Sequence, residues 1–413
     1  MTMRLACYGW VQEDAGSVAS AGHTVVAELL RRGHRADLFA DREHVPAPAD
    51  LVGDPRFAYV GLAPPRSSHL PAGLYRPAEL VLGPRWRQAW RRRFGAAARA
   101  RHELEPYDAL LSLGVAPAFV LGGVPTVAWL QSPVHTELEA VRRLRPLIHR
   151  VSGPSFYAAV TTYYVRRARR DARQLDLCDE VICGSSWSER ALADHGFPAE
   201  HLHALPYPID LARFSVRERD APAGPGPVLL SVGRLDPRKR LDLLVAAFDI
   251  VARSAPGARL MVVGHVGMAP NQLSLLDESA FRERIVYRRA VPQAAVPDLL
   301  RGADVLVQPS ENENFGSAVA EALASGVPAV VGPTNGTADY LDANSAVFSA
   351  YTPQAVAGAV LAVLDRRRRD PEAVARTTRD SAERWFSAAR VVDRLEEILE
   401  GAVAGRGGGR RPV

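Results

Sequence analysis

Short runs of strand-forming residues alternate with helix-forming stretches along most of this chain of 413 residues. This rhythm predicts parallel strands covered by helices, and hydrophobic residues, at 47% of the chain, suffice for a buried core. Strands are expected at Arg4–Tyr8, Arg35–Phe39, Ala109–Leu113, Thr126–Leu130 and Glu180–Cys183, and again at Val228–Val232, Arg259–Val263, Arg284–Tyr287, Val305–Gln308 and Ala329–Val331. Helices are expected at Ser17–Arg32, Arg240–Ser254, Ala295–Arg301, Ser317–Ser325 and about Val391–Leu399. The fold class is therefore α/β, with two doubly wound halves.

The stretch Asp220–Pro227, rich in Pro and Gly, separates the two halves. We expect a Rossmann-like domain at residues 1–207, a linker at 208–227 and a second Rossmann-like domain at 228–385. A C-terminal helix at 386–405 and a flexible tail at 406–413 complete the chain. Ligands of such sheets bind beyond the carboxyl ends of the strands, so the loops that follow strands should carry the chemistry.

Composition limits the class of partner and compartment. Lys239 is the single lysine among 51 basic residues, and the formal net charge is +5, which a coding bias towards arginine explains without a nucleic-acid partner. The three cysteines are widely spaced or lie in apolar runs, which fits a reducing compartment. No apolar stretch reaches the ~18–20 residues of a membrane span. The N-terminus lacks the apolar core of a secretory signal, so we expect a cytoplasmic protein.

The segment Gly233–Lys239 (GRLDPRK) follows an expected strand and precedes an expected helix. A glycine there lets the backbone approach a ligand, and Arg234 and Lys239 bring cations to a helix start whose amides already favour anions. A solvated basic corner is the alternative interpretation, as is a chance lysine at position 239. The pattern suits a diphosphate.

A second polar loop follows the expected strand Val305–Gln308 and contains Glu313. Glu321 lies eight residues later, inside an expected helix whose apolar surroundings argue for burial. Eight helical residues span ~12 Å, too far for two carboxylates that act as acid and base on one bond. They could instead hold two ends of one long ligand, such as the sugar and the ribose of a nucleotide sugar.

Together these motifs resemble the retaining glycosyltransferases of family GT4. The resemblance rests on Gly-Arg-Leu…Lys, on Glu-x7-Glu and on the Ala-x-x-Ser-Gly-x-Pro that follows. Ser185–Ser188 and Pro206–Asp210 match the family's Ser-x-x-Ser and Pro-x-x-x-Asp segments, and Gly16 lies where its first glycine-rich loop is usual. The resemblance covers most of the chain. It implies the GT-B architecture, in which two Rossmann-like domains face a central cleft and the last helix crosses back to the first, acceptor-side domain.

The resemblance also implies roles for individual residues. Arg234 and Lys239 should neutralise the donor diphosphate, and Glu321 should accept hydrogen bonds from the ribose. Glu313 should contact hydroxyls of the donor sugar, with the backbone of Asn314–Gly316 (Asn314, Phe315 and Gly316) nearby. No metal and no cofactor are expected, because a nucleotide sugar serves as co-substrate.

Two positions depart from the family pattern. Many members have an active-site histidine after the strand that corresponds to Thr126–Leu130, where this chain has Gln131. Either Gln131 or the nearby His135 takes that role, although a lone histidine is more often structural. Ser17 replaces the second glycine of the first loop, and puts a side chain beside Gly16 where backbone alone is usual.

The segment Arg85–Arg101 has no acidic residue, and Trp86, Trp90 and Phe94 fall on one face of a helix among arginines. Such a helix suits peripheral contact with the inner face of a membrane. The alternative is that the aromatic rings belong to the core and that the arginines form a solvated face.

The sequence thus predicts a retaining, metal-independent hexosyltransferase. It would move a hexosyl group from a UDP- or GDP-linked sugar to a hydroxyl of a small molecule, a glycan or a lipid-linked sugar. A nucleotide-sugar epimerase of the same fold and a non-catalytic nucleotide-sugar-binding protein are the alternatives. A sugar phosphorylase would need pyridoxal phosphate on a lysine, but the one lysine lies in the diphosphate motif. Base, sugar, acceptor and oligomeric state are not encoded in these residues.

Overall fold

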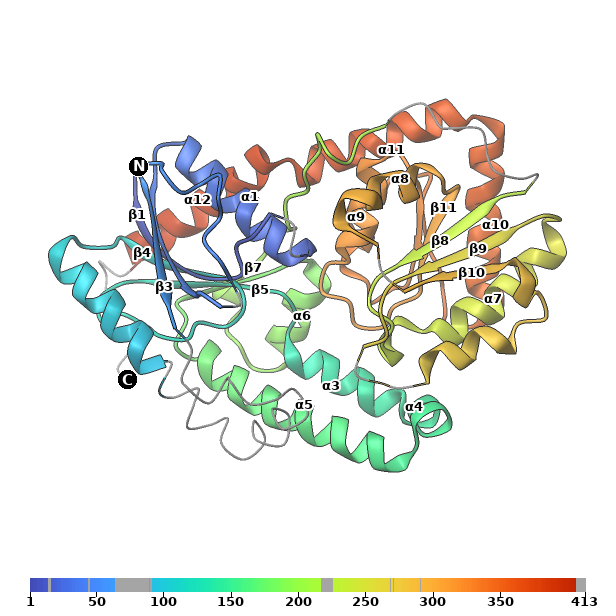
Figure 1. Cartoon of the computed structure of the whole chain (residues 1–413), viewed down its shortest axis with the longest axis horizontal. Helices are drawn as coiled ribbons and strands as arrows, with labels where there is room; N and C mark the ends of the chain where they lie inside the picture. Colours follow the sequence, from blue (N-terminus) through green and yellow to red (C-terminus); the bar gives the residue numbers. More distant parts are fainter. Residues whose placement is uncertain are drawn as a thin grey trace.

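The computed structural model describes residues 1–13, 16–43, 45–63, 89, 91–216, 226–267, 269, 271–289 and 291–405. Most of the expected linker Asp220–Pro227, the expected tail at 406–413 and Trp86 and Trp90 of the basic segment lie outside the described residues. Two α/β domains lie side by side, each built around one parallel sheet with helices packed against it (Figure 1).

The first domain has a seven-stranded sheet in the order β3-β2-β1-β4-β5-β6-β7. Its strands are β1 (Arg4–Gly9), β2 (Arg35–Asp41), β3 (Phe57–Leu62), β4 (Ala109–Gly114), β5 (Thr126–Leu130), β6 (Glu180–Cys183) and β7 (Leu202–Ala204). Its helices are α1 (Ser17–Arg31), α3 (Val134–Arg143), α4 (Arg145–Ser152), α5 (Pro154–Leu175), α6 (Ser186–Asp194) and the short 3-10 helix η2 (Ala199–His201), and residues 91–104 are also helical.

The second domain has a six-stranded sheet in the order β10-β9-β8-β11-β12-β13. Its strands are β8 (Val228–Val232), β9 (Arg259–Val263), β10 (Ile285–Arg288), β11 (Val305–Gln308), β12 (Ala329–Val331) and β13 (Ala346–Val347). Its α-helices are α7 (Leu241–Ser254), α8 (Val296–Arg301), α9 (Ser317–Ala324), α10 (Pro353–Arg369) and α11 (Pro371–Phe386), and they are followed by α12 (Ala388–Gly405). Its 3-10 helices are η3 (Pro237–Lys239), η4 (Gln272–Glu278), η5 (Arg282–Arg284), η6 (Gln293–Ala295) and η7 (Gly336–Tyr340).

Both sheets have the strand order of a Rossmann fold, with the reversal between β1 and β4 and between β8 and β11. Among the described residues, neighbouring strands of both sheets pair in parallel, for example Leu5 with Ala109 and Leu230 with Leu306. Ligands bind at such reversals, outside the carboxyl ends of the strands. The loops after β8 and β11 are the segments that carry the two expected donor motifs.

The alternation of the sequence predicts the central strands well. Thr126–Leu130, Val228–Val232 and Val305–Gln308 are strands with the expected limits, because continuous apolar runs bounded by turn residues are typical of buried parallel strands. The edge strand β3 was not expected, and every one of its residues is only half-buried. The helices α3, α4 and α5 were not expected either; one residue of α4 and four of the 22 residues of α5 are buried, whereas six of the ten residues of α3 are.

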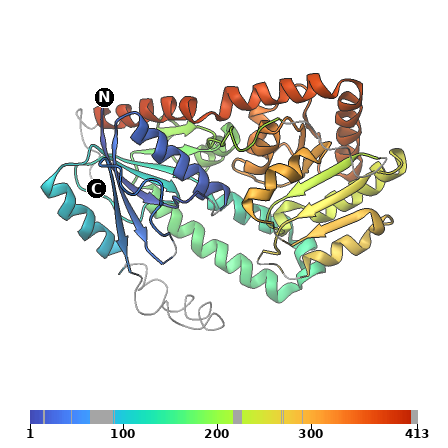
Figure 2. The same ribbon diagram turned by 45° about the horizontal axis from the view of Figure 1, so that its top comes forward.

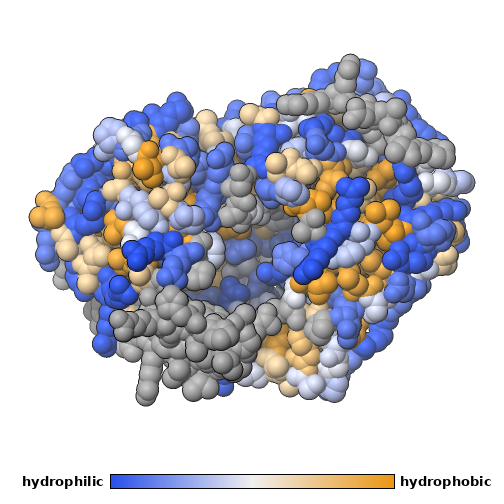
Figure 3. All heavy atoms as spheres, in the orientation of Figure 1, coloured by the Kyte–Doolittle hydropathy of each residue, from blue (hydrophilic) through white to orange (hydrophobic). Residues whose placement is uncertain are grey.

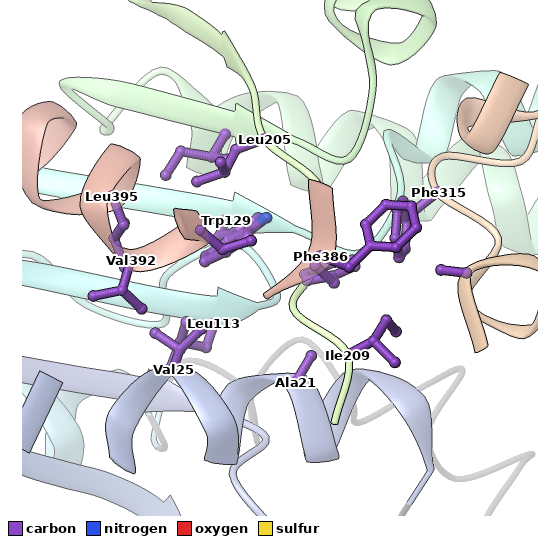
Figure 4. Packing of buried hydrophobic residues seen from close by; sticks show 14 of the residues in the cluster. Ala21, Val25, Leu113, Trp129, Leu205, Ile209, Phe315, Phe386, Val392 and Leu395 are labelled. Carbon is purple, nitrogen blue, oxygen red and sulfur yellow. The ribbon is translucent and has the colours of Figure 1, made fainter. Parts of the chain in front are cut away.

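One hydrophobic core extends through both domains. The close view in Figure 4 shows Trp129 of β5, Phe315 of the loop after β11 and Phe386 at the end of α11 in this core. The ring of Phe386 lies 5.5 Å from that of Phe315 in an edge-to-face arrangement. Tyr207, between the two sheets in sequence, stacks on Trp129 and donates a hydrogen bond to the carbonyl of Leu130. The loop of the second donor motif therefore packs directly on the first domain.

The chain's last helix also joins the domains. Helices α11 and α12 run from the second domain to the first along one side of the molecule (Figure 2), and α12 packs on α1. Arg32 forms ion pairs with Asp393 at 2.6 Å and with Glu396 at 2.7 Å. The buried His34 accepts the backbone N–H of Met3 at Nδ1, so its Nε2 carries the proton that it donates to Glu396 at 2.6 Å.

We predict that Phe386→Ala lowers the free energy of unfolding by about 3–5 kcal/mol, because it removes a fully buried ring at the meeting point of the two domains. Denaturant titration followed by tryptophan fluorescence measures the loss. Leu104→Ala is the control, since Leu104 is 87% exposed and should change stability little. Equal midpoints for the two variants would contradict a shared core at this position.

Candidate functional site

The carboxyl ends of both sheets open onto the region between the domains. The face seen in Figure 3 is hollowed there, and hydrophilic residues line much of the hollow. The described residues enclose a cavity of about 490 Å³ on the first-domain side, at the ends of β1, β2, β4 and β5. The described residues that line it all belong to the first domain, and one of them, Arg167, lies 3.6 Å from Glu137, which in turn lies 3.9 Å from Arg238 of the loop after β8.

The two donor motifs meet at Glu313. Its carboxylate contacts the Lys239 ammonium and accepts a hydrogen bond from Arg238 at 3.1 Å. All three side chains are largely buried. Burial opposes ionisation of Glu313, but Lys239 and then Arg238 outweigh it and hold the pKa of the carboxyl at about 2. Glu313 is therefore an anion at neutral pH, with two cations beside it.

Arg234, the other expected diphosphate ligand, is more open. Its side chain is 52% exposed and is paired with Asp236 in the same loop. It lies close enough to add to the positive field that keeps Glu313 ionised. Arg234, Arg238 and Lys239 thus form a cationic group at the start of the helical segment after β8.

Asn314, expected beside the donor sugar, instead joins the two domains through its side chain. Its amide nitrogen donates to the carbonyls of Leu130 at 3.0 Å and Gln131 at 2.8 Å, and its amide oxygen accepts the N–H of Gly184 at 3.1 Å. The Ser185 hydroxyl also donates to the Asn314 carbonyl at 2.8 Å. All four hydrogen bonds cross from the second domain to the first.

The next two residues of the motif serve the backbone. Phe315 is buried in the shared core, and Gly316 precedes α9 with φ of 86°. A Cβ on Gly316 would meet the Asn335 side chain at 2.8 Å, so both the dihedral angle and the close approach require glycine.

Glu321 lies in α9 and is 6% exposed. Burial raises the pKa of its carboxyl to about 8, and the positive charge of Arg213 only partly offsets the shift. At neutral pH this carboxyl is mostly protonated. A ligand that brings hydrogen-bond donors, such as a pair of hydroxyls, would favour the ionised form.

On the first-domain side, Gly16 caps α1 with φ of 98°, and a Cβ there would meet nothing within 4 Å. Ser17 is the half-buried first residue of α1. Gln131 follows β5 and lines the 490 Å³ cavity. Its backbone is held by Asn314, so its position depends on the motif of the other domain.

His135 does not share this environment. Its Nε2 donates to the carbonyl of Ala191 at 3.0 Å, and its ring stacks on His195 with 3.7 Å between centroids. Burial and the nearby His195 lower the pKa of His135 to about 4. It is absent from the lining of the cavity that the described residues form, whereas Gln131 belongs to it. The geometry favours Gln131 over His135 as the cleft residue.

Several site residues escaped the sequence interpretation. Arg238 reaches Glu313 and the carbonyl of Asn312, and lies 3.9 Å from Glu137 of the first domain. Glu311 is buried and pairs with Arg143 of α3 at 2.7 Å. Arg238 lies inside the segment Gly233–Lys239, but nothing in the sequence distinguishes it from the forty-nine other arginines. A buried partner in the other domain leaves no pattern in the neighbouring sequence.

The fold and the site together define a two-domain α/β protein in which loops rich in cations follow the strands of the second sheet, which is the GT-B architecture. Residues 213–381 match the family model described as glycosyl transferases group 1. The resemblance drawn from the motifs is thereby confirmed.

Individual relatives agree with this family. Mannosylfructose-phosphate synthase of Agrobacterium fabrum is 31% identical over 172 residues, which cover 37% of each chain. The chain spans between 33% and 54% of the length of the curated relatives considered. Sucrose-phosphate synthase of Thermosynechococcus elongatus superposes with a TM-score of 0.67 at 18% identity, over 98% of this chain and all of the other. HepE of Anabaena, solved with UDP and glucose, gives 0.63 at 16% identity, over 97% of this chain and all of the other. These likenesses confirm the GT-B fold.

We predict that Glu321→Gln stabilises the protein increasingly as pH rises. The unfolded carboxyl loses its proton near pH 4.5 and the folded one only near pH 8, so the folded state binds one more proton between these values. The free energy of unfolding of the natural protein therefore falls relative to the variant by up to about 1.4 kcal/mol per pH unit.

Denaturant titrations at pH 5.5, 6.5 and 7.5 (about one unit apart, within the window that the linkage relation defines) test this. Glu283→Gln is the control, because the Glu283 side chain is 69% exposed in the same domain. Parallel pH profiles for the natural protein and Glu321→Gln would show that the buried carboxyl titrates as an ordinary one.

Proposed function

We propose that this protein is a retaining glycosyltransferase that moves a hexosyl group from a UDP- or GDP-linked sugar to an acceptor hydroxyl. The observation that carries the proposal is the contact of Lys239 and Arg238 with Glu313, which unites the loops after β8 and β11 into one site. The match of residues 213–381 to the family model described as glycosyl transferases group 1 supports it. UDP and glucose in the structure of HepE, and the mannosyl and phosphate acceptors named among the relatives, are consistent with it.

In this proposal the cationic group receives the donor's diphosphate. Arg234, Arg238 and Lys239 offer a planar fork at two positions and a point charge at the third, and charge-assisted contacts to phosphate are stronger than neutral ones. Glu313 would accept hydrogen bonds from sugar hydroxyls, beside the backbone of Asn314–Gly316, and Glu321 from the ribose. Gly16 and Ser17 would approach the reacting end of the donor from the first domain.

Transfer with retention needs the bond from the anomeric carbon to the phosphate oxygen to break while the bond to the acceptor oxygen forms on the same face. The acceptor hydroxyl gives its proton to the departing phosphate oxygen. The protein's part is to position the reactants and to stabilise the growing charge on the diphosphate. The three cations supply the positive charge that stabilises the departing diphosphate, so we propose that the reaction requires neither a metal ion nor a cofactor.

Gln131 is the proposed first-domain partner of the donor sugar. Its side chain lines the cavity, and two carbonyls of its loop are held by the Asn314 amide. An amide can both donate to and accept from sugar hydroxyls but cannot become charged, so contact with Gln131 would be insensitive to pH. His135 is proposed to be structural, through its hydrogen bond to Ala191.

Peripheral membrane contact through Arg85–Arg101 is a separate hypothesis. Phe94 from that segment is buried against Tyr8, with 5.4 Å between ring centroids, which supports the core interpretation for that one aromatic ring. Trp86 and Trp90 lie outside the described residues. Within the part of the chain that the structure describes, helices that are both long and apolar enough to cross a bilayer are absent.

We predict that Lys239→Ala lowers turnover by about 10²–10³-fold, because the departing diphosphate loses one charge-assisted contact. Slow hydrolysis of UDP- and GDP-linked hexoses in the absence of acceptor measures this without knowledge of the acceptor. Arg253→Ala is the control, since it removes an exposed cation at the end of α7. Undiminished hydrolysis in Lys239→Ala would remove the lysine from the site, and complete absence of hydrolysis in the natural protein would favour a non-catalytic sugar-nucleotide-binding protein.

A second prediction separates the two glutamates. Glu321→Gln should weaken binding of the free nucleoside diphosphate by about tenfold, in line with the ~1.5–3 kcal/mol of hydrogen bonds to a charged group. Glu313→Gln should leave that binding nearly unchanged and impair use of the complete nucleotide sugar. Calorimetry with UDP and GDP, followed by donor hydrolysis, distinguishes them. Equal losses of nucleotide affinity in both variants would defeat the assignment of sugar to one carboxylate and ribose to the other.

A further inference from the structure

The cavity of the first domain has an unequal set of charges. Its lining includes three arginines, Arg91, Arg167 and Arg170, and two aspartates, Asp41 and Asp171. Its volume of about 490 Å³ is in the range of small-molecule sites. The cavity lies at the reversal between β1 and β4, where a Rossmann-like sheet binds its ligand. It is therefore placed for a ligand of the first domain, opposite the donor loops.

The two arginines of the cavity wall that belong to helix α5 already form ion pairs. Arg170 lies 3.3 Å from Asp171, and Arg167 lies 3.9 Å from Asp171 and 3.6 Å from Glu137. Asp171 is mostly buried, with a side chain 20% exposed. One carboxylate is thus shared by two arginines, so it neutralises Arg170 only in part.

Arg91 differs from both of them. It belongs to the helical stretch at residues 91–104 and is partly buried in the cavity wall. Among the described residues it forms no ion pair, and the groups that act on its charge are first the like charge of Arg170 and then Tyr8 and Asp171. Burial, and then repulsion by Arg170, lower the pKa of Arg91. A guanidinium held in this way is stabilised by an anion that lies between it and Arg170.

We propose that this cavity binds an acceptor that carries a phosphate group, with the phosphate between Arg91 and Arg170. This inference rests on the proposed function, because it assumes that a donor bound by the loops of the second domain gives its sugar to a ligand held in this cavity. Two guanidinium groups can offer paired N–H donors to a phosphate, and neither can lose its charge at physiological pH. The remaining polar groups of the wall, among them Gln131, are left to hold the hydroxyls of the acceptor. The phosphate can come from a small phosphorylated sugar or from a phospholipid headgroup.

The first arm of the test uses glucose 6-phosphate as probe and glucose as its neutral counterpart. Calorimetry at constant ionic strength should show that the phosphorylated sugar binds the natural protein at least tenfold more tightly. Arg91→Ala and Arg170→Ala should each weaken its binding by about tenfold or more, in line with the ~1.5–3 kcal/mol of a charged hydrogen bond, and Arg91→Lys by less. Arg92→Ala is the matched control, since it removes the same charge from the exposed neighbouring position.

The second arm distinguishes the source of the phosphate. Vesicles of phosphatidylcholine with and without phosphatidic acid are sedimented with each variant. Binding that requires phosphatidic acid and Arg91, and that glucose 6-phosphate reverses, identifies a lipid headgroup. Binding of glucose 6-phosphate alone identifies a small phosphorylated acceptor. Either result supports the proposal.

Three outcomes would overturn it: equal affinity for glucose and glucose 6-phosphate with no Arg91-dependent vesicle binding, equal losses in Arg91→Ala and Arg92→Ala, or no binding of either probe. Thermal melting and binding of UDP or GDP in each variant confirm that the protein is folded and that the donor site is intact. If the protein binds nucleotide normally but fails these tests, only the proposed phosphate site is refuted. If the natural protein binds no nucleotide, the proposed function itself is refuted.

Discussion

The site depends on the buried carboxylate of Glu313 and on the two cations that keep it ionised. An unpaired carboxylate in this position would be strongly destabilising, and Lys239 and Arg238 compensate for its lost hydration. Arg238 in turn lies 3.9 Å from Glu137, and Glu137 lies 3.6 Å from Arg167. A chain of alternating charges therefore runs from the loop after β11 to the wall of the first-domain cavity. One link of this chain, between Arg238 and Glu137, crosses from the second domain to the first and connects the loops of the second domain with the wall of the cavity electrostatically.

The amide side chain of Asn314 fixes the same two domains by geometry. It donates to two carbonyls of the loop after β5 and accepts from Gly184, and Ser185 donates to its carbonyl. These groups are buried, so a relative shift of the domains would leave backbone polar atoms without partners, at a cost of about 1–3 kcal/mol each. Gln131 therefore owes its place in the cavity to a residue 183 positions away in the sequence. The motif thus positions the first domain as well as lining the donor side.

The sequence predicts those features whose physics is local. Buried parallel strands such as Val305–Gln308 are continuous apolar runs with turn residues at their ends, and glycine at position 316 is set by a local dihedral angle. Features set by contacts between the domains leave no such pattern. The sequence predicted a role for the backbone of Asn314 but none for its side chain, which donates to two backbone carbonyls of the first domain. Arg238 looks like any other arginine until Glu137 is brought near it. The choice between His135 and Gln131 needed the structure, in which the His135 ring is hydrogen-bonded to the Ala191 carbonyl and stacked on His195.

The charges of the two carboxylates follow from opposite surroundings. Glu313 has its partners in the protein, so its pKa is held at about 2, whereas Glu321 has mainly apolar neighbours and its pKa is raised to about 8. The Glu321 carboxyl, which the fold compensates poorly, gains most from a ligand that supplies hydrogen bonds. The Glu313 carboxylate, which is already paired, must exchange partners when an anion binds its cations. A diphosphate at Lys239 would compete with Glu313 for the ammonium and leave that carboxylate free to accept from hydroxyls. In a donor complex of the proposed kind, anion binding and hydroxyl recognition would therefore be coupled through the Lys239–Glu313 ion pair.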